Sequence, residues 1–184
     1  FPSNMAVAAT SDSSLAYEQG KITALEARAL GVQITFSPVM DINNNPDNPI
    51  INFRAYSDNP ETVSKFGSAF IKGAQDNGLI ACAKHFPGHG NTATDSHTSL
   101  PTIKTSRSEL EKLELQSFKA AINAGVKMIM VGHIALPGLD ESGEPASHSS
   151  AITTNLLRNE MGFGGIIITD GMEMGGLAQA AWAG

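Results

Sequence analysis

Apolar residues along the chain fall into short runs, and segments with helical spacing lie between these runs. Five of the runs have the length and the β-branched content of buried parallel strands. They cover residues 4–10, 32–39, 79–83, 126–131 and 165–169. Four helical patterns alternate with them, at residues 13–30, 59–78, 106–125 and 153–161. This alternation predicts right-handed βαβ units and an α/β fold with a parallel sheet.

Helix start and stop signals support these boundaries. Asn59 is placed to cap the second helix, with Pro60 at its first position. Ser106 and Glu109 have the spacing of a capping box at the start of the third. Each pattern is followed by, or ends at, a glycine that suits a helix C-terminus: Gly31, Gly78, Gly125 and Gly162.

Polar residues at the predicted strand ends favour a barrel over an open sheet. Asp41, Lys84 and His85, His133 and Asp170 each follow a predicted strand. In a TIM-type (β/α)8 barrel the carboxyl ends of all strands meet at one mouth, so these residues would share a pocket. An open nucleotide-binding sheet usually has a G-x-G-x-x-G turn, and the sequence has none.

The length indicates that such a barrel is incomplete. A full barrel needs about 250 residues, whereas the chain has 184. We therefore expect a single partial barrel domain over residues 1–184, with about five to six βα units, and we interpret the chain as a piece of a longer protein.

Composition narrows the classes of partner. The formal net charge is −6, and the twelve Lys and Arg residues are dispersed, so a nucleic-acid partner is not expected. No apolar run approaches the ~20 residues of a membrane span. The single cysteine, Cys82, has no second cysteine for an internal disulfide and fits either redox compartment. The sequence therefore does not assign the protein to a cellular compartment.

Most of the candidate chemistry lies in one loop, KHFPGHGNTATDSHTSLP at residues 84–101, which we call the histidine loop. A βα loop of this length is typical of a functional segment. A metal site of His85 and His89, with Asp95 and His97 nearby, is one interpretation. It is disfavoured because Pro87 and the glycine after it prevent the helix on which a His-x3-His pair binds zinc best.

A proton-transfer pair is the preferred interpretation of the loop. Asp95 and His97 are two residues apart, so their side chains lie on the same side of an extended segment. An aspartate fixes the tautomer of a neighbouring imidazole and suits it to general acid/base catalysis near neutral pH. For His89 a structural role, tying the loop down, is favoured.

Asp170 is a lone carboxylate directly after an apolar strand, which is costly unless the group is solvated, paired or functional. Helix capping is the alternative role. A carboxylate together with a separate acid/base group at a barrel mouth is, however, what retaining glycoside hydrolysis requires.

The combination KHFPGHG, DSH and LP in this spacing resembles glycoside hydrolase family 3, in particular its β-N-acetylglucosaminidases, which remove N-acetylglucosamine from peptidoglycan fragments. The resemblance extends over nearly the whole chain. Further matching segments are PVMD at 38–41, NPIINFR at 48–54, Gly132-His133 and ITDGMEM at 168–174.

The resemblance implies the roles of the site residues. The nucleophile falls on Asp170, which would form a covalent glycosyl-enzyme. The acid/base falls on His97, oriented by Asp95. No metal and no cofactor are implied.

The substrate-binding residues implied by the family are Arg54, Lys84 and His85, which would hold the sugar hydroxyls. For Arg54 a surface ion pair is the alternative. The partner implied is a glycan with terminal β-linked N-acetylglucosamine. An earlier strand-end aspartate and an E-G-G-x-R segment of the family are expected before Phe1. Segment 43–50, NNNPDNPI, resembles exported members.

Alternatives remain open at this point. A β-glucosidase or another β-glycosidase of the same family is the nearest, and phosphorolysis in place of hydrolysis also fits. A metal-dependent hydrolase using His85, His89 and His133 is a different class. A catalytically inactive fragment that binds sugar is another.

Overall fold

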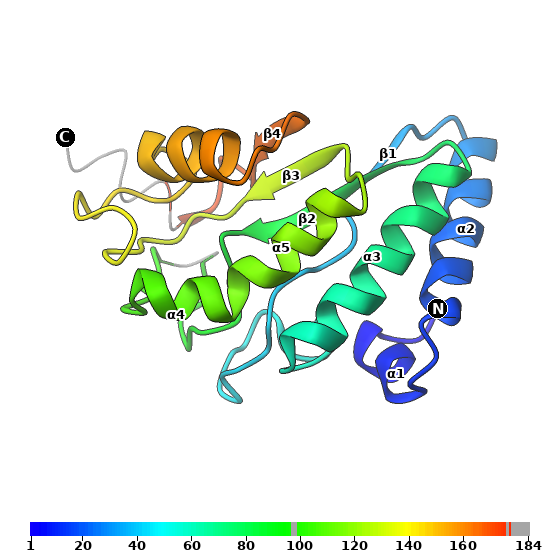
Figure 1. The fold of residues 1–184 in the computed structure, drawn as a ribbon, viewed down its shortest axis with the longest axis horizontal. Helices are drawn as coiled ribbons and strands as arrows, with labels where there is room; N and C mark the ends of the chain where they lie inside the picture. Colours follow the sequence, from blue (N-terminus) through cyan, green and yellow to red (C-terminus); the bar gives the residue numbers. More distant parts are fainter. Residues whose placement is uncertain (97–98, 176, 178–184) are drawn as a thin grey trace.

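The computed structural model describes residues 1–96, 99–175 and 177. Its strands are β1 (Ile34–Thr35), β2 (Ile80–Phe86), β3 (Met128–Val131) and β4 (Ile166–Thr169) (Figure 1). Its helices are α1 (Asn4–Ala9), α2 (Ser14–Ala29), η1 (Asn52–Arg54), α3 (Pro60–Asp76), α4 (Arg107–Lys112), α5 (Glu114–Asn123) and η2 (Ala151–Glu160).

The four strands form one parallel sheet in the order β1-β2-β3-β4. The spatial order thus follows the chain order, as in a barrel, and has no reversal of the kind that creates a switch point in an open sheet. The α/β class and the parallel sheet are confirmed, and the sheet is an incomplete barrel. The described residues hold four strands rather than the five predicted.

The two faces of the sheet have different surroundings. Ala81 and Ala83 of β2 and Ile129 and Val131 of β3 belong to the main hydrophobic core, which also includes residues of α3, α5 and η2. The alternate residues of the same strands form a separate cluster: Cys82, Met128 and Met130, with Ile80 and Ile168 packed against them. Because strand side chains alternate between faces, this second cluster lies on the side that becomes the interior of a barrel.

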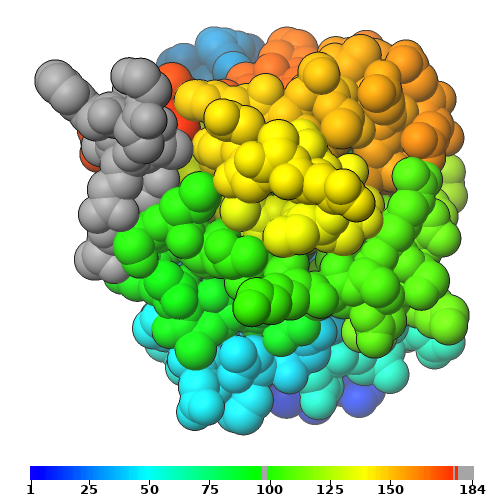
Figure 2. Space-filling view, turned by 90° about the vertical axis from the view of Figure 1, so that its left-hand side faces the viewer, coloured from blue at the N-terminus to red at the C-terminus, as the bar shows by residue number. Residues whose placement is uncertain are grey.

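The carboxyl ends of the strands are covered by the segments that follow them. Figure 2 looks onto this side of the molecule, where the segment after β1 (cyan), the histidine loop after β2 (green) and the segment after β3 (yellow) lie next to one another. Residues far apart in the sequence therefore meet at this end.

The strand predicted at residues 4–10 was wrong, because residues 4–9 form α1. Ser3 caps this helix, and its hydroxyl accepts a hydrogen bond from the Ala6 N–H. Three of the six helical residues are alanine, which has the highest helix propensity. A short apolar run of this length can form a strand or a helix. Here the Ser3 cap favours the helix.

The other predicted elements are present with shifted boundaries. The capping box at Ser106 and Glu109 and the cap at Asn59 are confirmed. The third predicted helix is divided at Leu113, whose φ of −119° and ψ of −87° separate α4 from α5. The helix predicted at 153–161 is η2, of the wider π type. No helix in the described residues has both the length and the apolarity needed to cross a bilayer.

Candidate active site

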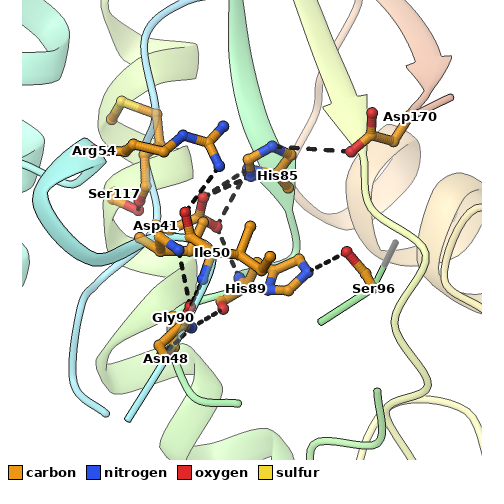
Figure 3. A network of polar contacts seen from close by, with 12 residues as sticks. Asp41, Asn48, Ile50, Arg54, His85, His89, Gly90, Ser96, Ser117 and Asp170 are labelled. Atoms are coloured by element: carbon orange, nitrogen blue, oxygen red, sulfur yellow. Dashed lines mark hydrogen bonds and ion pairs between the residues drawn. The ribbon is translucent and has the colours of Figure 1, made fainter. Parts of the chain in front are cut away.

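A cavity of about 350 Å³ lies at the carboxyl ends of β2 and β4. Four residues that the sequence predicted for the site line it, although they come from three separate parts of the chain: Arg54, Lys84, His85 and Asp170. Ile50, His89 and Ser96 complete the lining. Figure 3 shows the polar contacts among most of these side chains.

Asp41 lies behind this cavity and is fully buried. Its segment runs beside the end of β2, where the Met40 N–H donates to the Lys84 carbonyl over 2.7 Å. The Asp41 carboxylate accepts hydrogen bonds from the His85 N–H at 3.2 Å, the His89 N–H at 2.7 Å and the His85 ring at 2.7 Å. One carboxylate thus binds two residues at the start of the histidine loop.

The electrostatic balance favours an ionised Asp41. Burial by itself would raise the pKa of this carboxyl. The charge and ring hydrogen bond of His85, with the contacts to His89, outweigh burial and hold the pKa below its usual value. A buried carboxylate that accepts several N–H groups is stable in this form.

The hydrogen bond to Asp41 also orients the His85 ring. Nδ1 faces the Asp41 Oδ2 atom, so the hydrogen on Nδ1 is donated to the carboxylate. Nε2 then points toward the cavity, where it lies 3.9 Å from the Asp170 Oδ2 atom (Figure 3). His85 therefore presents a defined nitrogen beside Asp170.

Asp170 directly follows β4, and its own N–H continues the sheet by donating to the Val131 carbonyl over 2.9 Å. The Oδ1 atom accepts the Gly171 N–H at 2.8 Å. The side chain is 26% exposed and lines the cavity. The strand thus supplies a carboxylate that is anchored at one oxygen and accessible from the cavity.

Two cations lie on the wall of the same cavity. Burial and the positive charge of Arg54 lower the pKa of Lys84, while the carboxylates of Asp170 and Asp41 oppose this shift. Arg54 ends η1 and donates from its guanidinium to the Ile50 carbonyl over 3.0 Å. Both groups are hydrogen-bond donors that line the same cavity as Asp170.

Asn48 joins the segment after β1 to the histidine loop. Its amide nitrogen donates to the carbonyls of His89 at 2.8 Å and Gly90 at 2.9 Å. Its amide oxygen accepts the N–H groups of Ile50 and Ile51. Because one buried side chain makes all four contacts, it fixes the segment that carries Arg54 against the segment that carries His89.

His89 ties the loop down, as the sequence indicated. Its Nε2 atom lies 2.9 Å from the Ser96 hydroxyl, and the ring is buried. Ser96 lines the cavity and is flanked by Asp95 and His97. The Asp95 carbonyl accepts the Ser99 N–H at 3.1 Å. His97 lies outside the described residues, so the pairing of Asp95 with His97 stays a prediction.

Sequence reasoning did not assign a role to Asp41, Asn48 or Ser96. Asp41 lies at a predicted strand end and closes the PVMD segment that resembles the family, and these two positions were the available signals. Asn48 opens the matching NPIINFR segment and Ser96 is the middle residue of DSH, but neither position indicated a role, because polar side chains in loops are common.

The metal-dependent alternative required His85, His89 and His133 to converge. His133 is instead held by other groups: its Nδ1 lies 2.7 Å from the Ser147 hydroxyl and its Nε2 lies 3.0 Å from the Gly171 carbonyl. Among the residues whose placement is described, no group of three or more His, Cys, Asp or Glu side chains could hold a metal ion.

Comparison with known proteins gives one consistent family. Residues 1–182 match the glycosyl hydrolase family 3 N-terminal domain. Beta-hexosaminidase A of Pseudoalteromonas piscicida is 39% identical over 97% of this chain and 32% of its own length.

Solved structures agree with this match. A glycoside hydrolase family 3 β-N-acetylglucosaminidase from Paenibacillus sp. str. FPU-7 superposes with a TM-score of 0.94 and 44% identity, over 96% of this chain and 34% of that one. The beta-glucoside phosphorylase BglX superposes with a TM-score of 0.94 and 34% identity, over 97% of this chain and 34% of that one. The chain spans about a third of the length of these relatives. It belongs to glycosyl hydrolase family 3.

Proposed function

We propose that residues 1–184 form a single partial barrel domain within a retaining exo-β-N-acetylglucosaminidase. Its substrate would be a glycan with terminal β-linked N-acetylglucosamine, such as a peptidoglycan fragment. The observation that carries this proposal is that Asp170 opens onto the cavity lined by Arg54, Lys84 and His85. The relatives named β-hexosaminidase and β-N-acetylglucosaminidase support the acetamido-sugar specificity.

In the first step, the Asp170 carboxylate attacks the anomeric carbon of the bound sugar. The bond from that carbon to the glycosidic oxygen breaks, and protonated His97 gives its proton to the departing oxygen. The products are a free leaving group and a glycosyl ester on Asp170. Asp95 orients the imidazole and stabilises its protonated form.

In the second step, neutral His97 takes a proton from a water molecule as that water attacks the anomeric carbon. The ester bond to Asp170 breaks, and the sugar leaves with its original anomeric configuration. Two inversions at one carbon give this retention. The enzyme returns to an ionised Asp170 and a protonated His97.

Substrate binding falls to the polar groups around the nucleophile. Arg54 and Lys84 donate hydrogen bonds to sugar hydroxyls, and His85 offers Nε2 to another hydroxyl. Since Asp41 holds the other His85 nitrogen, binding does not require the ring to reorient. Donors that are already in place stabilise the transition state more than the ground state where they lie beside an atom on which charge develops.

The experiment compares an aryl β-N-acetylglucosaminide with the matching aryl β-glucoside, using the complete polypeptide that carries this chain. We expect turnover of the acetamido sugar, with the β anomer as the first product seen by NMR. Asp170→Asn should lower kcat by about 10⁴-fold, the order found for an essential catalytic group. Asp58→Asn, at an exposed aspartate away from the cavity, is the matched control.

The role of His97 has its own test. His97→Ala should slow substrates with poor leaving groups much more than activated aryl glycosides, because only the former need a proton at the departing oxygen. Equal losses for both kinds of substrate would contradict the assignment.

A second candidate is phosphorolysis, in which phosphate replaces water in the second step. The likeness to a protein named as a β-glucoside phosphorylase favours it, as do the two cations in the cavity. Added inorganic phosphate would then accelerate turnover and give the sugar 1-phosphate. A faster reaction with the aryl β-glucoside would point to a β-glucosidase instead.

A further inference from the structure

His133 is a buried histidine that the proposed mechanism does not use. It follows β3, has only 1% of its surface exposed, and lies beside the turn that begins at Asp170. Its two ring nitrogens contact Ser147, in the segment after β3, and Gly171, directly after the nucleophile. The ring therefore bridges two segments that come together only in the folded chain.

The identity of these partners determines the tautomer. The Gly171 carbonyl is an acceptor only, so the ring nitrogen 3.0 Å from it, Nε2, carries a hydrogen. In the neutral ring Nδ1 is then an acceptor, and the Ser147 hydroxyl, 2.7 Å away, donates to it. Ser147 thus favours the tautomer that holds Gly171.

Gly171 in turn holds the nucleophile. Its N–H donates to the Asp170 Oδ1 atom over 2.8 Å. Its carbonyl, the atom that His133 binds, also accepts the Met174 N–H at 3.2 Å. Only two backbone torsions, φ and ψ of Gly171, separate its N–H from its carbonyl. A hydrogen bond that restrains the Gly171 carbonyl therefore also limits the direction of the Gly171 N–H.

The segment that carries His133 also holds the histidine loop. The Gly132 N–H donates to the Phe86 carbonyl over 2.9 Å. The Ala135 N–H donates to the Pro101 carbonyl at 2.8 Å, and the Ala135 carbonyl accepts the Ile103 N–H at 2.9 Å. A single short segment is therefore bonded both to the turn of Asp170 and to the two ends of the loop that contains His97.

We propose that His133 is a positioning residue for Asp170: through Nε2–H and the Gly171 carbonyl it sets the direction of the carboxylate relative to the histidine loop. This inference rests on the proposed role of Asp170 as nucleophile. It assigns to His133 an effect on the chemical step and none on substrate binding, because Arg54 and His85 are held by other contacts.

The test uses two substitutions in the complete polypeptide. His133→Leu removes both polar contacts, whereas His133→Gln keeps an N–H donor near the position of Nε2. We expect His133→Leu to lower kcat about 10²-fold with KM little changed, the size of effect of a small misplacement of reacting groups. His133→Gln should recover most of this loss. His148→Gln, at an exposed histidine of the same segment, is the control.

The outcomes separate the proposals. Wild-type kcat in His133→Leu, a change confined to KM, or equal losses in the Leu and Gln variants would overturn the role of His133. If the wild-type protein turned over neither sugar, the proposed function would fail instead. A measurement that needs no activity is ¹⁵N NMR of the histidine rings, with the His133 signals identified by their absence in His133→Gln. Hydrogen on Nε2 supports the inference, and a ring with hydrogen only on Nδ1 overturns it.

Discussion

The Asp41 carboxylate and the His85 imidazole form a buried pair, with 2.7 Å between Oδ2 and Nδ1, while the opposite nitrogen of the same ring faces Asp170. The pair thus connects the protein interior to the candidate active site through one side chain. An aspartate that accepts three N–H groups leaves His85 one tautomer and little rotational freedom. Removal of the Asp41 carboxylate should therefore affect both the stability of the fold and the candidate active site.

Asp41→Asn is expected to destabilise the protein by about 3 kcal/mol, because the amide places N–H groups against the donors of His85 and His89. KM should rise, since His85 is no longer held toward the sugar. The pKa of Asp41 is lowered in the folded state, so its contribution to stability is present above the ordinary value of 3.8 and is lost as the pH falls through the folded pKa. Denaturant titration across this pH range checks the expectation.

Asp47→Asn is the matched control for this change, because Asp47 is an exposed aspartate of the same segment. An Asp41→Asn protein as stable as the Asp47→Asn protein would show that the three hydrogen bonds add nothing to the free energy of unfolding.

Glu114→Gln is expected to stabilise the protein. Glu114 is buried, its Oε1 accepts one hydrogen bond from the Asn44 amide at 3.1 Å, and among the described residues its Oε2 has no partner. Burial raises the pKa of this carboxyl, so the ionised form costs stability as the pH rises from the ordinary value of 4.5 through the folded pKa.

The gain from Glu114→Gln should therefore be about 1 kcal/mol at neutral pH and should vanish below the ordinary pKa, where the wild-type side chain is protonated in both states. Thermal unfolding at several pH values measures it. Glu26→Gln, on the exposed surface of α2, should show no such pH-dependent gain. A gain that is the same at every pH would exclude ionisation as its cause.

Cys82 is expected to resist thiol reagents in the native protein. Its side chain is fully buried in β2, and burial raises its pKa to about 12, despite the nearby positive charge of Lys84. Only the thiolate reacts readily. Mass spectrometry of the Cys82 peptide after alkylation at pH 8 should show labelling in denaturant and almost none without it. Equal labelling in both conditions would mean that the reagent reaches Cys82 in the native protein.

Gly90→Ala is expected to disrupt the histidine loop. A Cβ atom at this position would lie 1.5 Å from the Ile42 carbonyl oxygen, and neither atom can rotate away, because the backbone fixes the positions of both. We expect a loss of about 3 kcal/mol or more in stability, with a fall in kcat/KM, because the loop must move away from residue 42. Gly164→Ala meets no atom within 4 Å and is the control. A melting temperature of the Gly90→Ala protein equal to that of the wild type would contradict the close approach of residue 90 to the Ile42 carbonyl.

The helix boundaries show how far local signals extend. Asn59 and Ser106 cap helices as predicted, because a cap depends only on residues two or three positions away. The apolar pattern predicts a strand at residues 4–10, because so short an apolar segment shows no helical period. Its helical state depends on the Ser3 cap and on alanine content, which the pattern of apolar residues does not express.

The α/β alternation, the helix caps, the residues at the strand ends and the histidine loop can all be predicted from the amino-acid sequence. These depend on local spacing and on backbone preference. Which strand-end groups meet is seen in the folded chain alone: Asp41 binds the backbone and ring of His85 across 44 positions, and His133 binds Gly171 across 38. Such contacts follow from strand register and from side-chain orientation. Both are set by the packing of the whole sheet, so no local pattern contains them.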